Sequence, residues 1–328
     1  MQPDVDPETI VYFGGKFVPM REASVGILTH ALHYGTGVFE GIRAHWDESS
    51  QELFIMRPRE HYERWKRNCG ILRIDVPNAV EELCAITVEL LQRNNFRANL
   101  YIRPLAYKCA QRIGVATDDR DAFAIAAIPF GEYFAAQNGL HAGVSAWRRN
   151  EDNAIPPRAK ICGAYANSAL ASDDAHRCGF DEAILLNQSG HVTEGATCNL
   201  FMVRGGRLVT PSITEDVLEG ITRDTVMELT RREMEVETIE RPIDRSELYY
   251  CDELFLAGTG VAIVPVVKVD YRPVKDGAVG PLTTRLRQLY FDATHGHLPA
   301  YRKWLLPVYG VGGPLEKTAA RVKETSLA

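Results

Sequence analysis

The sequence predicts an α+β fold with two domains. Its 328 residues exceed the ~100–200 residues of a typical domain. The predicted helices and strands lack the regular β-α-β order of a doubly wound sheet, which favours the α+β class. No G-x-G-x-x-G follows a strand and opens a helix, so a dinucleotide-binding fold has little support. We expect a small α/β domain at 1–133, a linker at 134–141 and a larger β-rich domain at 142–328.

The elements of the first domain follow from turn and capping signals. Two β-prone runs flank Gly14-Gly15 within residues 11–18, which predicts a hairpin. Asn78 precedes Glu81 by three residues, as in a capping box, and apolar residues follow at helical spacing, so a helix is expected at about 78–94. Two further β-prone runs predict strands at 99–107 and 122–129.

The second domain is richer in strands. A helix should begin after Gly220, and the glycine-rich turn at 257–260 should end a strand. The elements expected here are strands at 182–186, 197–203, 207–210 and 253–256 and a last helix at about 281–294.

Composition excludes several classes of protein. The net charge of −6 argues against nucleic acid as a partner, because phosphate binding needs a basic surface. The seven cysteines form no C-x-x-C pair, so we expect no disulfide framework and no metal site, and a reducing cytoplasm suits them. No signal peptide is evident at the start, and no run of about 18 apolar residues predicts a membrane span.

Lys160 stands among small and apolar residues in the segment RAKICGAYAN (158–167), with Tyr165 five positions on. Burial disfavours the charged form of a lysine, which is what a Schiff-base lysine requires. From this segment alone, a surface lysine beside a loop is the favoured interpretation.

Three other segments could serve a phosphorylated cofactor. Glu194 stands between two predicted strands, where a buried carboxylate could keep a pyridine nitrogen protonated, or could simply solvate a turn. Thr222 opens a predicted helix, whose free N–H groups could hold a phosphate or need only a cap. The turn at 257–260 could also offer N–H groups to an anion.

Together, in this order, these segments resemble the fold-type-IV pyridoxal-phosphate (PLP) enzymes, which share a D-amino-acid aminotransferase-like fold. Within that group the chain resembles the branched-chain amino-acid aminotransferases over about residues 10–308. The matching motifs are THALHYGTGVFEGIR (29–43), RPREHYERW (57–65), NLYIRPL (99–105), RAKICGAYANS (158–168), GHVTEGATCNLF (190–201), LEGITRD (218–224) and FLAGTG (255–260).

The resemblance implies roles for residues around the cofactor. Lys160 would form the imine linkage to pyridoxal 5′-phosphate and then carry the proton of the reaction. Tyr165 would bond the phenolic oxygen of the cofactor, and Glu194 its pyridine nitrogen. The phosphate would be held by Arg64, Ile221, Thr222 and Thr259, the arginine through its planar fork of donors.

The resemblance also implies a substrate pocket for small amino and 2-oxo acids. Tyr101, Arg103, Thr259 and Gly260 would bind carboxylates, with Arg103 reserved for the second carboxylate of glutamate. The apolar side-chain pocket would be formed by Tyr34, Phe39, Tyr133 and Tyr165. An apolar cavity with an arginine at its edge accepts both a branched aliphatic chain and an acidic one. A loop from a neighbouring subunit closes the site in this family, so a homodimer or higher homo-oligomer is implied.

The expected activity is transfer of an amino group from leucine, isoleucine or valine to 2-oxoglutarate. Two departures from the family pattern concern the substrate: Gln111-Arg112-Ile113 replaces a Gly-Met-Gly-type run, and Val261-Ala262 follows the glycine-rich turn. Similar loops occur in relatives that accept amines without a carboxylate, so a side activity on (R)-amines is a second hypothesis.

Other activities of the same fold stay open. A lyase of the aminodeoxychorismate type would share fold and lysine, although the YIRP segment and Phe39 favour a transaminase. D-amino-acid transamination usually relies on an arginine–histidine clamp, whereas here Leu105 follows Arg103 two places on. A non-enzymatic protein would have little reason to carry Lys160, Glu194 and Arg64 together.

Overall fold

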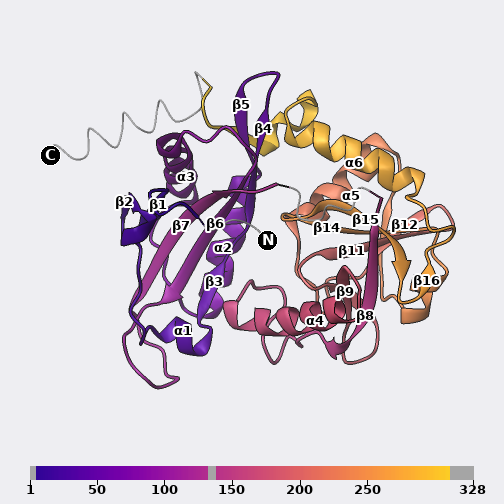
Figure 1. Ribbon diagram of the computed structural model, residues 1–328, viewed down its shortest axis with the longest axis horizontal. Helices are drawn as coiled ribbons and strands as arrows, with labels where there is room; N and C mark the ends of the chain where they lie inside the picture. Colours follow the sequence, from indigo (N-terminus) through magenta and orange to yellow (C-terminus); the bar gives the residue numbers. More distant parts are fainter. Residues whose placement is uncertain (1–4, 132–137, 311–328) are drawn as a thin grey trace.

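The computed structural model describes residues 5–131 and 138–310, and Tyr133 with part of the predicted linker lies outside them. Two β-sheets, each with its own helices, lie side by side (Figure 1). Helices and strands are mixed in the α+β manner that the sequence predicts. The first strand of the second sheet, β8 (Leu140–Arg148), begins within the predicted linker.

The first sheet contains eight strands in the order β17-β5-β4-β6-β7-β1-β2, with β3 beside β6. The predicted hairpin is confirmed, because β1 pairs antiparallel with β2 around Gly14-Gly15. The strands are β1 (Ile10–Phe13), β2 (Lys16–Pro19), β3 (Gly37–Phe39), β4 (Ile42–Asp47), β5 (Glu52–Met56), β6 (Leu100–Lys108), β7 (Asp121–Pro129) and β17 (Leu305–Pro307).

Helices α1 (His30–Tyr34), α2 (Pro58–Ile71) and α3 (Val80–Asn94) accompany this sheet. Helix α2 buries Tyr62 and Trp65, and the Trp65 indole N–H donates to the Val38 carbonyl at 2.9 Å. This packing fixes α2, which carries Arg64, against β3.

Asn78 does not cap helix α3, and this prediction was wrong. The N-cap residue is Ala79, whose N–H donates to the Glu82 carboxylate at 3.0 Å. Asn78 lies in the preceding loop, where its carbonyl accepts a hydrogen bond from Lys66 Nζ at 2.5 Å. The helix therefore begins one residue later than predicted, where the Glu82 carboxylate reaches back to the backbone of residue 79.

The second sheet has nine strands in the order β10-β9-β8-β15-β14-β11-β12-β13, with β16 beside β15. Strand β10 pairs with both β9 and β11. The strands β10, β9, β8, β15, β14 and β11 therefore form a closed barrel. The closing pair of residues is Glu194 and Asn199. The remaining strands are β9 (Glu182–Leu186), β10 (Val192–Gly195), β11 (Asn199–Arg204), β12 (Arg207–Thr210), β13 (Thr238–Glu240), β14 (Glu253–Gly258), β15 (Ala262–Val269) and β16 (Arg272–Pro273).

Helices α4 (Tyr165–Arg177), α5 (Ile221–Glu233) and α6 (Pro281–Thr294) belong to the second half, and α5 and α6 confirm two predictions. Both pack on stacked Phe201 and Phe255, whose ring centres are 5.1 Å apart. Short 3₁₀ helices complete the chain at 20–22, 162–164, 245–249 and 299–304. Within the described ranges, no helix combines the length and apolar character needed to cross a membrane.

The chain end returns to the first sheet, so the two halves are joined more than once. Strand β17 pairs antiparallel with β5, and the buried Glu52 carboxylate accepts the N–H groups of Val308 and Tyr309 at 3.0 and 2.8 Å. Arg57, at the start of α2, donates to Asp224 on α5 at 2.7 Å. These contacts hold α2 and α5 together at the seam between the halves.

Candidate active site

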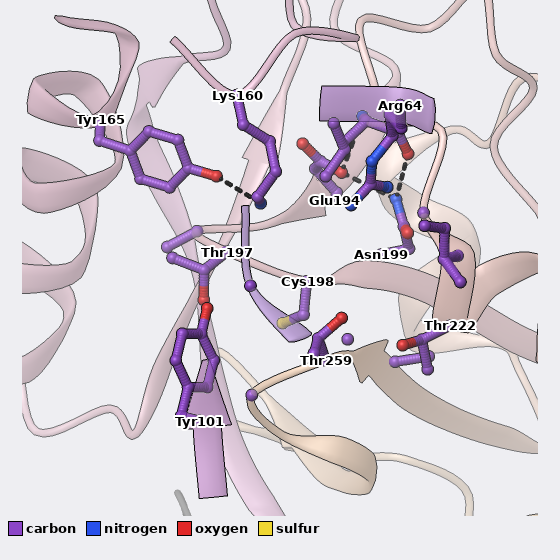
Figure 2. A pocket seen from close by; sticks show the side chains of 18 of the residues that line it. Arg64, Tyr101, Lys160, Tyr165, Glu194, Thr197, Cys198, Asn199, Thr222 and Thr259 are labelled. Atoms are coloured by element: carbon purple, nitrogen blue, oxygen red, sulfur yellow. Dashed lines mark hydrogen bonds between the residues drawn. The ribbon is translucent and has the colours of Figure 1, made fainter. Parts of the chain in front are cut away.

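A cavity at the seam collects side chains from both halves of the molecule (Figure 2). Every residue that the sequence assigned to cofactor binding lines it: Arg64, Lys160, Tyr165, Glu194, Ile221, Thr222 and Thr259. They come from α2, α4, β10, α5 and the β14–β15 turn, with Lys160 in the segment between β8 and α4. The fold therefore brings together residues spread over nearly 200 positions of the sequence.

Lys160 is half-buried, and its Nζ donates to the Tyr165 hydroxyl at 2.8 Å. Its backbone is fixed from the other half, because Lys160 O accepts the N–H of Phe39 at 3.1 Å and Ile161 bridges Val38. Tyr165 begins α4, whose first turn thus sets the distance between amine and phenol. The aromatic ring of Phe39 lies 5.1 Å from Nζ, so the amine faces an apolar wall as well as a hydrogen-bonding partner.

Glu194 is nearly completely buried, with 3 % of its surface exposed. Its Oε1 lies 2.7 Å from Arg149 Nη2 in an ion pair, and its Oε2 accepts hydrogen bonds from Asn199 Nδ2 at 2.9 Å and from the Leu218 N–H at 3.2 Å. A carboxylate offers about four acceptor positions. One position on Oε1 therefore remains for a donor in the cavity.

Arg149 is a residue of this cavity that the sequence did not reveal. Burial raises the pKa of Glu194 above its ordinary value, and the Arg149 guanidinium opposes that rise. Arg149 follows β8 directly and is buried, whereas its neighbour Arg148 is exposed. The sequence shows two adjacent arginines and gives no signal as to which one pairs with a carboxylate.

Arg64 is oriented by a second buried carboxylate, Glu40. Arg64 donates from Nε and Nη2 to Glu40 at 2.7 and 2.8 Å, and from Nη1 to the Glu219 carbonyl at 2.8 Å. The His61 ring also bonds Glu40, at 2.9 Å. Burial acts to raise the pKa of Glu40, but Arg64 and His61 outweigh it and hold that pKa well below its usual range. Of the five guanidinium N–H groups, two remain for an anion.

The start of helix α5 supplies further donors. Its N-cap residue, Gly220, has no side chain, so no side chain caps the first N–H groups of Ile221 and Thr222. A Cβ at Gly220 would meet Asn199 Oδ1 at 2.0 Å, so the approach of β11 to the helix start requires glycine here. The Tyr290 hydroxyl hydrogen-bonds Thr222 from behind. This helix terminus is suited to hold an anion near Arg64.

These residues fit a phosphorylated pyridine aldehyde by the chemistry of their donor sets. An amine with a phenol beside it, an ion-paired carboxylate with a free acceptor position, and a guanidinium beside a bare helix terminus line one cavity. They match the carbonyl carbon, the pyridine nitrogen and the phosphate of pyridoxal 5′-phosphate, respectively. Lys160, Glu194, and Arg64 with Thr222 would hold these three parts.

A second cavity of about 520 Å³ opens beside Lys160 and Tyr165. Tyr101 and Arg103 project into it from β6, and Ala126 and Ile128 from the paired strand β7. Arg103 Nη2 donates to the Tyr101 hydroxyl at 3.1 Å. The described residues that line it are largely apolar: Val5, Met20, Phe39, Ala126, Ile128, Phe130 and Val261, together with Tyr101, Arg103, Lys160, Tyr165, Thr197, Gly258 and Gly260.

A close contact sets one end of this second cavity. A Cβ at Gly41 would lie 2.0 Å from the Tyr101 hydroxyl, so only glycine lets the tyrosine turn towards Gly260. The Arg103 guanidinium lies over the Phe39 ring at 4.2 Å. Cation and apolar surface thus share one wall, as the sequence predicted for a pocket that takes two kinds of side chain.

Tyr34 and Arg112 are not among the described lining residues of either cavity. The Tyr34 hydroxyl accepts the Gly114 N–H at 2.9 Å, and Tyr34 lines neither cavity among the described residues of its own chain. Arg112, from the run that departs from the family pattern, donates to the Ala116 carbonyl at 2.6 Å. Tyr133 lies outside the described residues.

Comparison with known proteins gives consistent results. The family model of amino-transferase class IV matches residues 37–269. A probable branched-chain-amino-acid aminotransferase of Aquifex aeolicus is 47 % identical over 299 residues, covering 91 % of this chain and 96 % of that protein. The branched-chain aminotransferase of Thermoproteus uzoniensis with norvaline is 41 % identical, with a TM-score of 0.87 over 92 % of this chain and 99 % of its own. The PLP form of the Thermobaculum terrenum enzyme is 37 % identical, with a TM-score of 0.88 over 93 % and 99 %.

Proposed function

Because the chain belongs to the branched-chain amino-acid aminotransferase family of the class IV aminotransferases, whose cofactor is pyridoxal 5′-phosphate, we propose that it transfers the amino group of leucine, isoleucine or valine to 2-oxoglutarate. The products are the branched 2-oxo acids and L-glutamate. One observation carries the choice of substrates: a largely apolar cavity beside Lys160 has the Arg103 guanidinium in its wall. An aliphatic side chain can pack there, and a γ-carboxylate can pair with Arg103.

When bound, the cofactor supplies the electron sink that makes the Cα proton of an amino acid labile. Lys160 Nζ then acts as the base that takes this proton and returns it later in the reaction. The Tyr165 hydroxyl, 2.8 Å from Nζ, orients the amine. Glu194, held by Arg149, Asn199 and the Leu218 N–H, maintains a negative partner for the ring nitrogen.

We assign the substrate carboxylate to the region where the first and second cavities meet. Tyr101, Lys160 and Gly260 line both cavities, and Thr259 lines the first. Turn N–H groups and a phenol are neutral donors, so they bind a carboxylate without fixing which side chain accompanies it. Phe39 and Tyr165, whose ring centres are 4.6 Å apart, pack against the side chain.

The direct test is turnover of L-leucine with 2-oxoglutarate, measured as 4-methyl-2-oxopentanoate and glutamate. We expect sustained formation of both products by the wild-type holoenzyme, and none by Lys160→Ala, which should also lose the yellow colour. Turnover of D-alanine in place of L-leucine, or pyruvate release from aminodeoxychorismate, would instead assign the chain to the D-amino-acid transaminases or the lyases. Normal turnover by Lys160→Ala would refute the chemistry altogether.

A side activity on (R)-amines is proposed on the apolar character of the same cavity. Phe130 and Val261 join Phe39 in its lining, so an aromatic amine without a carboxylate can be accommodated. The test is formation of acetophenone from (R)-1-phenylethylamine and pyruvate. Absence of acetophenone at high enzyme loading would exclude this side activity while leaving the main proposal intact.

A homodimer is proposed from an exposed apolar surface around α1 and the 111–115 segment. Its members are between 43 and 77 % exposed: Val25, Ile27, Leu28, Leu32, Ile113 and Val115. Large contiguous apolar patches mark interfaces. Within this surface, the Tyr34 hydroxyl accepts a hydrogen bond from the Gly114 N–H. A second copy docked here would bring Tyr34 near the cavity of its partner, as the family pattern implies.

The oligomeric state tests this surface. Leu32→Asp should convert a dimer into monomers in sedimentation analysis, because a charge in an apolar interface is costly. Leu170→Asp, which adds a charge at another exposed leucine, should leave the dimer intact. A wild-type monomer would contradict the proposal.

We also place the protein in the cytoplasm, supported by its seven unpaired cysteines.

A further inference from the structure

A third cavity, of about 470 Å³, lies behind the Thr259–Gly260 turn. Those two residues also line the cofactor cavity, so the turn separates the two spaces. The other walls come from β4, β15 and α6. We refer to it as the rear cavity.

The rear cavity is lined by two arginines, Arg43 and Arg287, and by two imidazoles, His45 and His295. None of its described lining residues is an aspartate or glutamate. A concave surface with charges of one sign concentrates counter-ions. The protein as a whole carries a net charge of −6, so this local excess of cations is not a property of the general surface.

Two of the polar residues that line the rear cavity, both on β4, are buried. Arg43 and His45 are 8 and 7 % exposed, and Arg43 Nε and His45 Nε2 have no hydrogen-bond partner within the described ranges. Leaving a buried polar group unsatisfied costs about 1–3 kcal/mol. Arg43 is also held in place, since its Nη2 donates to the Phe130 carbonyl at 3.1 Å and its guanidinium lies over the Phe130 ring at 4.8 Å.

The imidazole of His45 adds no positive charge to the rear cavity. Burial lowers the pKa of His45 well below its usual value, and neighbouring Arg43 and His295 lower it further. The positive charge that a ligand meets is therefore that of Arg43 and Arg287. Two guanidinium groups suit a planar, bidentate acceptor such as a carboxylate.

The rear cavity also has an apolar part to its lining, formed by Ile263, Val264 and Phe291, and the Phe291 ring stacks on His295 with ring centres 3.9 Å apart. Inorganic phosphate would leave this surface in contact with water. A carboxylate that carries a hydrocarbon chain would cover it and still meet the guanidinium groups. We propose that the rear cavity is a second binding site, separate from the catalytic one, for a small organic carboxylate.

A hydrogen bond links the lining of the rear cavity to the proposed substrate site. Arg43 Nη1 donates to the Gly260 carbonyl at 3.4 Å, on the turn proposed to hold the substrate carboxylate. A ligand of the rear cavity would thus sit against the residue that supports this turn. Binding of a carboxylate in the rear cavity does not depend on which amino acid is the substrate, so it can be tested by binding and not by turnover.

The test is equilibrium dialysis with the catalytic site filled. Enzyme loaded with N-(5′-phosphopyridoxyl)-L-leucine has its cofactor and substrate cavities occupied, and loading is checked by absorbance. Radiolabelled 4-methylpentanoate should then bind with a limit of one equivalent per chain. Arg287→Gln should weaken this binding about tenfold or more, the effect of a lost charge-assisted bond of about 1.5–3 kcal/mol.

Arg285→Gln is the matched control, because Arg285 is exposed on the same helix and does not line the rear cavity. Its binding of 4-methylpentanoate should equal that of the wild type. No saturable binding by the loaded enzyme, or equal binding by Arg287→Gln, would overturn the proposal. So would an equal loss in both variants, or inorganic phosphate that binds more tightly and displaces the carboxylate. Failure of the adduct to load would instead count against the proposed function.

Discussion

Replacing Arg149 with methionine tests whether the second half of the molecule tunes the cofactor through Glu194. Arg149 Nη2 lies 2.7 Å from Glu194 Oε1, and both residues are buried. Without the guanidinium, Glu194 keeps the donors of Asn199 and Leu218 but loses its charged partner. Since burial raises the pKa of Glu194 and Arg149 opposes it, the pKa should rise further in the variant.

The size of the effect follows from the bond that is lost. A hydrogen bond to a charged group contributes about 1.5–3 kcal/mol, which corresponds to a factor of about 10–150 in an equilibrium or rate constant. A protonated Glu194 cannot keep a ring nitrogen protonated, so kcat should fall by that factor near neutral pH. Because a carboxyl group ionises as the pH rises, the loss should be greatest in acid and smaller in alkaline solution.

The assay is kcat for leucine and 2-oxoglutarate from about pH 6 to about pH 9, with each variant saturated with cofactor. Arg148→Met is the matched control, because Arg148 is the exposed neighbour and its backbone carbonyl, which the substitution leaves in place, accepts a hydrogen bond from Asn167 Nδ2. The control should follow the wild-type profile. An Arg149→Met enzyme with wild-type kcat across this range, or a loss that does not depend on pH, would refute the reasoning.

Three further predictions concern other groups of the site. Arg103→Gln should lower kcat/KM for glutamate about 10- to 150-fold but change that for leucine little, since only glutamate has a second carboxylate; equal losses would contradict it. Tyr290→Phe should raise the dissociation constant of the cofactor about 2- to 12-fold, the value of one neutral hydrogen bond to Thr222; Tyr301→Phe, which loses a bond to Glu233 instead, should not. Glu40→Gln should lower the free energy of unfolding of the apoenzyme at neutral pH by about 3–5 kcal/mol, because a buried charge pair is broken. As the pKa of Glu40 is lowered by folding, this difference should shrink as the pH falls below about 4.3, and a constant difference in urea denaturation would contradict it.

The elements that the sequence predicted are those with local signals. Helix α6 begins and ends where expected because Pro281 follows Gly280 and the apolar spacing continues to residue 294. Strand β17 has no such signal, since its three residues exist through pairing with β5. The start of α3 was misplaced for the same reason: Lys66, distant in sequence, binds the carbonyl of Asn78.

The candidate site likewise contains residues that motifs identify and residues whose role only tertiary contacts reveal. Lys160, Glu194 and Arg64 stand in motifs that resemble a family, so they could be named from the sequence. Glu40 and His61 stand in the same motifs, but their role depends on contacts across β3 and α2 that no spacing rule encodes. What local patterns omit is the set of buried partners that orient the residues a motif names.

Charged residues from both halves of the molecule meet at the seam between them. The first half supplies Arg64 and Arg103, and the second supplies Lys160, Glu194 and the start of α5, so neither half alone contains the proposed site. Two buried charges at the seam have partners fixed before any ligand arrives: Arg64 is paired with Glu40, and Glu194 with Arg149. The desolvation cost of these charges is thus met within the protein, and the donors left over are already aimed at the cavity. A ligand that joins the halves then binds to a rigid frame and loses little free energy in ordering it.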